Sequence, residues 1–224
     1  MTGILYIVAT PIGNLSDITL RAIDILKSVD LILGEDTRVT KKLLDHFEIK
    51  TPTISYHQHS QFQKVEQIIQ FLKEGKNLAL VSDAGTPGIS DPGNKLVQEV
   101  TKSLNDLVKI VSVPGPSALI AAASISGFPM DKFFFMGFPP HKNKRKKFFE
   151  EVARQSADFP VIFYESPHRI LKSLKELELQ TKVVVCRELT KKFETIYRGE
   201  IEEVIKLVEK DKILGEFVVI VGKR

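Results

Sequence analysis

The sequence predicts an α/β protein built from two consecutive α/β domains. Continuous apolar runs at Ile4 to Ala9 and Leu78 to Val81 are typical of strands covered on both faces of a parallel sheet. Segments with apolar residues at helical spacing lie between such runs, and this alternation predicts βαβ units. A chain of 224 residues has room for two domains, which we expect at residues 1–128 and 129–224, with the boundary at Gly127 to Asp131.

The composition describes an ordinary folded protein with a small positive charge. Hydrophobic residues make up 43% of the chain, and 32 Lys and Arg against 28 Asp and Glu give a net charge of +4. This charge permits an anionic partner without requiring one. Cys186 is the single cysteine and lies in an apolar run, which excludes a disulfide framework and predicts a buried thiol. No signal-peptide pattern and no run of membrane-spanning length is present, so we expect a cytoplasmic protein with no membrane part.

The loop after the strand Leu78 to Val81 is the main candidate for a ligand site. Residues 85–93 include three glycines and two prolines, which combine positions free to take positive φ with positions fixed at about −65°. Asp91 followed by Pro92 predicts the start of a helix. A strand, a stiff glycine loop and a helix N-terminus form the ligand sites of open α/β sheets. The alternative is a tight connection that binds nothing, and the aspartates Asp83 and Asp91 argue against it.

Three further loops follow predicted strands of the first half in the same way. They are Thr10 to Asn14, Gly34 to Arg38, and Pro114 to Ala118. Loops at the carboxyl ends of parallel strands share one edge of the sheet, so they can face a common ligand. Ser117 stands beside the amide groups of a predicted helix start, where a carboxylate or a ribose hydroxyl would find donors.

A dense basic run marks the second half of the chain. It follows Pro139 and Pro140, and its cations are Lys142, Lys144, Arg145, Lys146 and Lys147. One interpretation is a solvated helix start. The other is a surface for the RNA backbone, which is favoured because cations at a helix N-terminus oppose the helix dipole and therefore call for a functional reason.

The motifs taken together resemble one family. Ser82 to Gly93 is similar to the signature loop of the bacterial ribosomal RNA small subunit methyltransferase I family, a branch of the tetrapyrrole methylase (class III methyltransferase) superfamily. Five more segments resemble that family in order and spacing: Ala9 to Leu15, Gly34 to Arg38, Val113 to Ala118, Tyr164 to Arg169, and Arg187 to Lys191. The resemblance covers essentially the whole chain. Family members commonly continue beyond the position of Arg224, and such an extension would carry RNA affinity of its own.

The resemblance implies an S-adenosyl-L-methionine-dependent enzyme that acts as a homodimer and holds its cofactor in a cleft between two α/β domains. The implied reaction is methylation of the ribose 2′-hydroxyl of a cytidine near the decoding centre, on small-subunit (16S) ribosomal RNA or the assembled 30S subunit. By the same resemblance, the cofactor contacts are Asp83, Ala84, Gly85, Ile89, Ser117, Ala118, Tyr164, Arg187 and Gly215.

A 2′-hydroxyl needs a base to remove its proton before it becomes a good nucleophile. Asp36 and Glu35 stand at a predicted strand end and are the candidates for this base, while Arg38 or Lys191 would bind a neighbouring phosphate. The alternative for this segment is structural, with Asp36 as a helix cap and Arg38 as a surface charge. Glu188 and His168 are reserve candidates for the base.

The sequence leaves two other functions and a metal site to consider. His57 and His59 could share a strand face, but no third ligand is apparent, so they are interpreted as polar loop residues and no metal is expected. A methyltransferase for a tetrapyrrole (precorrin-type) substrate would need cationic groups for the substrate carboxylates. A non-catalytic RNA-binding module would not need loops shaped for a cofactor.

Overall fold

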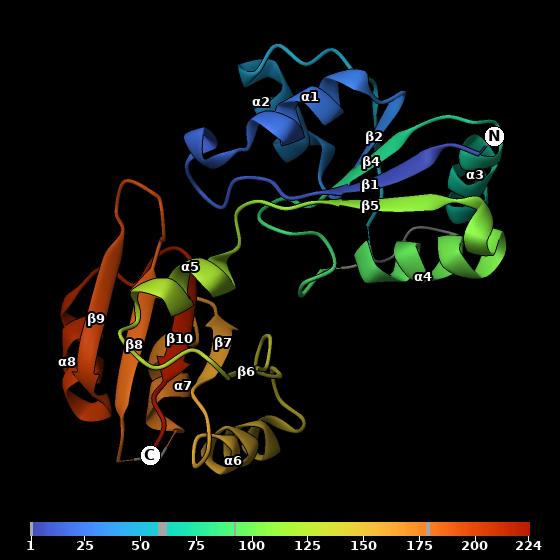
Figure 1. Cartoon of the computed structure of the whole chain (residues 1–224). Helices are drawn as coiled ribbons and strands as arrows, with labels where there is room; N and C mark the ends of the chain where they lie inside the picture. The colour runs from blue at the N-terminus through green and yellow to red at the C-terminus, as the bar shows by residue number, and fades with distance from the viewer. Residues whose placement is uncertain (1, 58–61, 92, 178–179) are drawn as a thin grey trace. The chain divides into compact units, whose positions relative to one another are not determined.

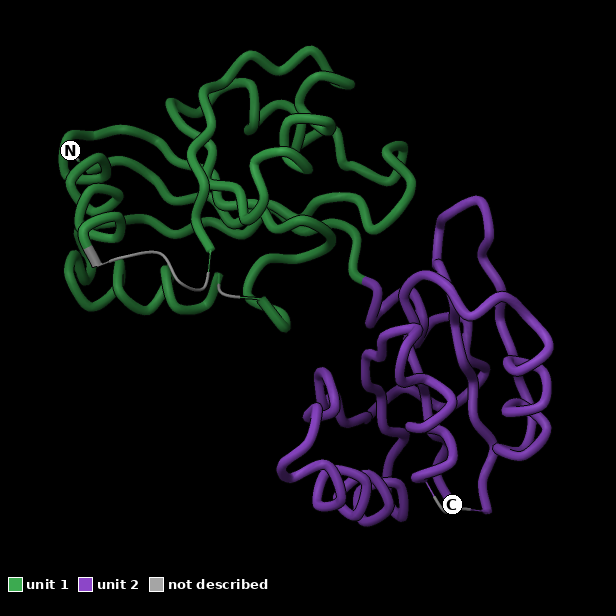
Figure 2. Tube along the Cα trace, turned by 180° about the vertical axis from the view of Figure 1, so that it is seen from behind, with its two compact units in different colours: residues 1–117 green, residues 118–224 purple. Residues whose placement is uncertain are grey.

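The computed structural model describes residues 2–57, 62–91, 93–177 and 180–224, which form two compact units, residues 1–117 and 118–224 (Figure 2). The predicted boundary at residue 128 is therefore corrected to residue 117. The reason is helix α5 (Ala118–Ile125), which packs against strands β7 (Val161–Glu165) and β10 (Phe217–Val221) of the second unit. Each unit is an α/β structure, which confirms the predicted fold class of two consecutive α/β domains.

The first unit contains a five-stranded sheet in the order β3-β2-β4-β1-β5, and every pair in it is parallel. Its strands are β1 (Ile4–Val8), β2 (Leu31–Gly34), β3 (Thr53–Ser55), β4 (Leu78–Val81) and β5 (Lys109–Val113). Because the strands are parallel, the loops that follow them emerge at one edge of the sheet. This edge carries the predicted ligand loops.

Helices cover both faces of that sheet (Figure 1). Helices α1 (Leu20–Ser28) and α2 (Thr37–His46) cover one face, and α3 (Phe62–Lys73) and α4 (Gly93–Leu104) cover the other. The position of strand β4 between these two layers of helices explains why its sequence is apolar throughout. Leu78 and Leu80 pack in the core under α3 and α4, while Ala79 and Val81 pack in the core under α1 and α2. Short 3-10 turns at Leu15–Asp17 (η1) and Asn105–Leu107 (η2) complete the unit.

The second unit contains a mixed sheet in the order β6-β7-β10-β8-β9. Strand β6 (Phe134–Phe135) pairs with β7 in parallel, and the pairs among β7, β10, β8 (Lys182–Arg187) and β9 (Thr195–Glu200) are antiparallel. Helices α6 (Arg145–Gln155), α7 (Ile170–Lys175) and α8 (Ile201–Lys210) share one core with the sheet. Helix α5 packs on β10 and β7 outside that core, and every residue of β10 is buried (Figure 1).

Candidate active site

The loops that follow β1, β4 and β5 are joined to one another at the carboxyl edge of the first sheet. The backbones of Thr10 and Gly85 exchange two hydrogen bonds, at 2.9 and 3.0 Å. The hydroxyl of Thr10 donates to the carbonyl of Ser82 at 3.0 Å, and the hydroxyl of Thr86 donates to the carbonyl of Pro116 at 3.2 Å. Three segments far apart in the sequence therefore form one continuous surface.

The glycine-rich loop is fixed from within by Asp91. Its Oδ1 accepts hydrogen bonds from the amides of Gly88 and Gly93, both at 2.7 Å. Gly88 has φ of 89°, which favours glycine, and a Cβ added to Gly93 would lie 2.8 Å from the nitrogen of Gly88. Helix α4 begins at Gly93, while Pro92, expected as its first residue, lies outside the described residues. The loop is thus a stiff structure rather than a slack connection.

Carboxylates gather where β2 and β4 end. Asp83 accepts a hydrogen bond from the amide of Asp36 at 2.9 Å, which ties these two loops together. Burial raises the pKa of Glu35, and the nearby charges of Asp83 and Asp91 raise it further. A half-buried carboxylate with a raised pKa is better suited to accept a proton near neutral pH than an ordinary exposed one.

Asp36 has a different environment from its neighbour Glu35. Its carboxylate caps α2 by accepting from the amide of Arg38 at 2.9 Å, and it pairs with the Arg38 guanidinium at 2.6 Å. These hydrogen bonds lower the pKa of Asp36 to about 2. The side chain of Arg38 is 87% exposed. The structure therefore favours the capping interpretation of Asp36 and Arg38, and Glu35 is the better candidate for a base.

The predicted cofactor residues of the first unit present varied chemistry at this edge. Asp83, Ala84 and Ile89 are exposed, Gly85 is buried, and Ser117 is half-buried. An exposed carboxylate beside Glu35 suits the positive sulfonium and ammonium groups of S-adenosyl-L-methionine, and an exposed isoleucine suits its adenine ring. The residues present therefore fit the cofactor that the resemblance implies.

The predicted cofactor residues of the second unit have structural partners. Arg187 is buried, and its guanidinium donates to the carbonyl of Leu214 at 2.9 Å and to Asp211 at 2.8 Å. Gly215 has φ of 88°, and a Cβ there would lie 2.3 Å from Glu188 Cδ. The guanidinium of Arg187 therefore stabilises the turn that precedes β10 in the same unit.

Lys191, proposed as a phosphate ligand, is already engaged by two carboxylates. Its ammonium lies 2.8 Å from Glu188 and 2.8 Å from Glu216. Glu188 and Thr190 both have positive φ, 51° and 66°, which costs free energy in residues with side chains. The hydroxyl of Thr190 is buried without a hydrogen-bond partner among the described residues. A phosphate would have to compete with both carboxylates for Lys191, which weakens that assignment.

Arg145 is a correction to the predicted basic surface. Its side chain is only 6% exposed, and its guanidinium donates to Glu176 at 2.6 Å and to the hydroxyl of Ser173 at 2.7 Å. It also lies 3.8 Å from Glu165, whose side chain is fully buried. Lys142, Lys144, Lys146 and Lys147 are all exposed. The surface available to RNA thus consists of the four lysines, because Arg145 belongs to the interior.

Sequence reasoning missed the buried carboxylate at the centre of this interior network. Glu165 ends β7 and pairs with Arg169 at 2.8 Å as well as with Arg145. Arg169 also donates to the carbonyl of Pro139 at 2.9 Å. Helical spacing could not have indicated this pair, because Glu165 ends a strand and Arg169 lies in the turn before α7.

Comparison with known proteins places the chain in a family. The model for Tetrapyrrole (Corrin/Porphyrin) Methylases matches residues 4–205. Proteins called ribosomal RNA small subunit methyltransferase I are 48% identical in Bacillus subtilis, over 98% of this chain and 75% of that protein, and 44% identical in Thermotoga maritima, over 98% of both. The relative of the same name in Vibrio cholerae is 50% identical over 97% of this chain and 76% of its own length. The chain belongs to the ribosomal RNA small subunit methyltransferase I family.

Solved structures agree with this assignment at the level of the fold. A diphthine synthase matches 99% of this chain and 90% of its own, with a TM-score of 0.76 at 12% identity. A cobalt precorrin-4 methyltransferase matches 97% and 94%, with a TM-score of 0.68 at 18% identity. These structures and the family match confirm the tetrapyrrole methylase fold, and the names of the relatives at 44 to 50% identity confirm the expectation of a methyltransferase. Members of this family are methyltransferases by name, which argues against a non-catalytic binding module.

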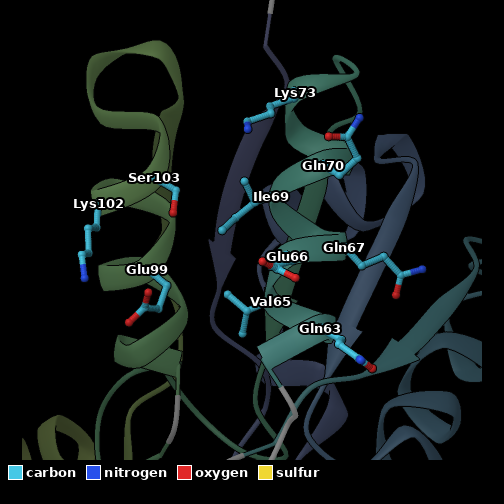
Figure 3. A pocket seen from close by; sticks show the side chains of 10 residues that line it. All are labelled: Gln63, Val65, Glu66, Gln67, Ile69, Gln70, Lys73, Glu99, Lys102 and Ser103. Carbon is cyan, nitrogen blue, oxygen red and sulfur yellow. The ribbon is translucent and has the colours of Figure 1, made fainter.

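One groove in the described part of the chain lies apart from the predicted site residues. A groove between α3 and α4 is lined by Gln63, Val65, Glu66, Gln67, Ile69, Gln70, Lys73, Glu99, Lys102 and Ser103, and includes none of the predicted site residues (Figure 3). No group of three or more His, Cys, Asp or Glu able to hold a metal ion occurs among the described residues. Of the two histidines weighed as ligands, His59 lies outside the described residues. Within the described ranges no helix is long and apolar enough to cross a membrane.

Proposed function

We propose that the protein transfers the methyl group of S-adenosyl-L-methionine to the ribose 2′-hydroxyl of a cytidine in small-subunit ribosomal RNA, near the decoding centre. The observation that carries this proposal is the identity of 43 to 50% over nearly the whole chain to proteins named for small-subunit ribosomal RNA methylation. The carboxylate cluster at the glycine-rich loop gives that activity a chemical basis.

Glu35 is the proposed general base. S-adenosyl-L-methionine, when bound, supplies a methyl group already activated by its sulfonium centre. The carboxylate of Glu35 would take the proton of the 2′-hydroxyl, so that the oxygen could accept the methyl group from the bound cofactor. Its raised pKa makes it a stronger base than an exposed carboxylate, and its side chain is only partly buried. Asp83, whose carboxylate orders the Asp36 backbone, places negative charge beside the cofactor.

The four exposed lysines are proposed to hold the RNA backbone. Phosphate contacts of this kind give affinity and orientation but do not read sequence. The relatives' names favour an RNA substrate over a tetrapyrrole, because proteins 48 and 50% identical to this chain are named for ribosomal RNA methylation. The cytoplasm, where ribosomal RNA is assembled into subunits, is the proposed location.

The test is a methyl-transfer assay on two substrates. The protein is incubated with labelled S-adenosyl-L-methionine and either free small-subunit RNA or assembled 30S subunits, and ribose methylation is mapped by primer extension at low nucleotide concentration. We expect one methylated cytidine ribose with at least one of the substrates. Methylation of a base, or no transfer to either substrate, would refute the proposal.

Cofactor binding and assembly have separate measurements. S-adenosyl-L-methionine at a hundred times its Kd should stabilise the folded protein by about 2.7 kcal/mol, visible as a raised melting temperature. A homodimer, also proposed from the resemblance, should have twice the 25.2 kDa mass of the chain in light scattering.

A further inference from the structure

Phe138 exposes about half of an aromatic ring beside the basic run. The residue is 53% exposed, and its ring centroid lies 5.3 Å from that of Tyr164 at an angle of 57°. Tyr164 in turn contacts Phe135 edge-on, with centroids 4.9 Å apart. One side of the Phe138 ring is thus supported by other aromatic rings, and the exposed part is available to a partner.

The backbone that carries this ring is held at the two residues that follow it. Arg169 donates to the carbonyl of Pro139 at 2.9 Å, and Arg145 donates to the carbonyl of Pro140 at 3.3 Å. Both guanidinium groups are anchored by the buried Glu165. Two prolines restrict the same backbone further. The ring is therefore presented by a preorganised segment, which reduces the entropy lost when a ligand stacks on it.

Exposed lysines begin four residues after Phe138 in the sequence. Lys142, Lys144, Lys146 and Lys147 are exposed, and Lys146 forms a long ion pair with Glu150 at 3.9 Å. An aromatic ring next to several lysines is the combination that binds single-stranded RNA, because bases stack on the ring and phosphates meet the cations. A purely apolar partner would gain nothing from the lysines.

We propose that Phe138 is a stacking platform for an unpaired base of the substrate RNA, with the four lysines holding the phosphates next to that base. The inference rests on the proposed function for its substrate class. It adds to that function a nucleobase contact that does not depend on base identity, since every base has a π face. The affinity for RNA then has two contributions, one from base stacking and one from salt-dependent phosphate contacts.

The first experiment compares Phe138→Ala with Phe134→Ala. Phe134 is a matched control because it is 41% exposed in the same unit, but its ring contacts Phe159 instead. Phe138→Ala should weaken binding of a single-stranded RNA from the substrate region by about 5- to 100-fold. Its slope of log Kd against log salt concentration should not change, because stacking releases no counterions. Phe134→Ala should bind like the unchanged protein.

The second experiment uses tryptophan as a reporter, which is possible because the chain contains no tryptophan. Phe138→Trp keeps a stacking ring, so it should bind RNA normally and its fluorescence should be quenched when a base stacks on it. Phe134→Trp should show no quenching. An RNA with abasic sites but an intact backbone should bind Phe138→Trp more weakly and quench it less.

Three outcomes would overturn the inference. If Phe138→Ala binds RNA with unchanged affinity and Phe138→Trp is not quenched, the unchanged protein still binding RNA, the platform is refuted while the proposed function stands. If the unchanged protein binds neither the RNA nor assembled 30S subunits, both are refuted. If Phe138→Ala keeps RNA affinity but changes the mass seen in light scattering, the ring belongs to an interface between protein chains.

Discussion

Nε of Arg145 donates to Oε2 of Glu176 across 2.6 Å, and this contact gives one cation of the basic run a different role from its neighbours. The same guanidinium reaches Ser173, Pro140 and Glu165. Helix α6 therefore starts with a residue that joins it to α7 and to the end of β7. The lysines on either side remain exposed because the periodicity of the helix and its preceding turn directs only Arg145 inward.

Removing Arg145 should destabilise the protein, since Glu165 would lose one of its two arginine partners inside the unit. We expect Arg145→Met to lower the free energy of unfolding by about 3 kcal/mol, as for other broken buried pairs. The measurement is urea denaturation at neutral pH. Lys147→Met is the control, and its effect should stay within about 0.5 kcal/mol because Lys147 is exposed. Equal stability of the two variants would contradict the buried role of Arg145.

The four lysines should account for the salt dependence of RNA binding. Changing Lys142, Lys144, Lys146 and Lys147 to glutamine together should reduce the slope of log Kd against log salt by about 3, at ~0.7 for each phosphate contact on a single strand. Folding and cofactor affinity should change little, because all four side chains are exposed.

A control with the same loss of charge separates a local contact from general attraction. Lys206, Lys210, Lys212 and Lys223 are exposed lysines elsewhere in the second unit, and their replacement by glutamine should leave the slope nearly unchanged. Equal slopes for the two variants would show that net charge, and not this run, attracts the RNA.

The elements could be predicted from the sequence because apolar periodicity is a local signal. Strand β4 at Leu78–Val81 lies where the apolar run placed it. The burial of Arg145 could not be predicted, because Ser173 and Glu176 are 28 and 31 residues away. The predicted position of the domain boundary was wrong for a related reason, since only the packing of α5 on β10 shows which unit that helix joins.

The candidate site shows the same division between local and distant information. Glu35 and Asp36 are adjacent, and both stand at a strand end, so the sequence offered no reason to prefer either as the base. The choice depends in part on distant partners, because Asp83 and Asp91 act on Glu35, whereas Asp36 caps α2 and binds Arg38 only two residues away. The glycine loop was recognisable because its residue types are themselves the signal for positive φ.

Cys186 should be inert in the folded protein. It is fully buried in β8, and burial raises the pKa of its thiol to about 11, so the reactive thiolate is scarce at neutral pH. We expect a thiol reagent that releases a coloured product to modify Cys186 at pH 8 only as fast as the protein unfolds. In denaturant the reaction should be immediate. Rapid modification without denaturant would show that β8 opens locally.

Glu35→Gln should remove most of the methyl transfer while stabilising the fold at neutral pH. Loss of the general base should lower the rate by about 100- to 10,000-fold, measured as kcat for methyl transfer to the unmethylated RNA substrate. The stability effect follows from the raised pKa of Glu35, because at pH 7 the folded state carries a carboxylate that burial and two nearby charges disfavour. Glutamine carries no charge and avoids that cost. As the pH falls through the folded pKa and then the unfolded value of 4.5, Glu35 becomes neutral and the advantage of glutamine should vanish.

Asp36→Asn is the matched control, with the opposite sign. The pKa of Asp36 is lowered to about 2 by its hydrogen bonds to Arg38, so its charge stabilises the folded state above the unfolded value of 3.8. The variant should therefore be less stable at pH 7, and the difference should fade as the pH falls toward 2. Because Asp36 is a cap and not the base, kcat should fall far less than in Glu35→Gln. A Glu35→Gln enzyme that keeps kcat within tenfold, or an Asp36→Asn enzyme that loses more, would assign the proton transfer to another group.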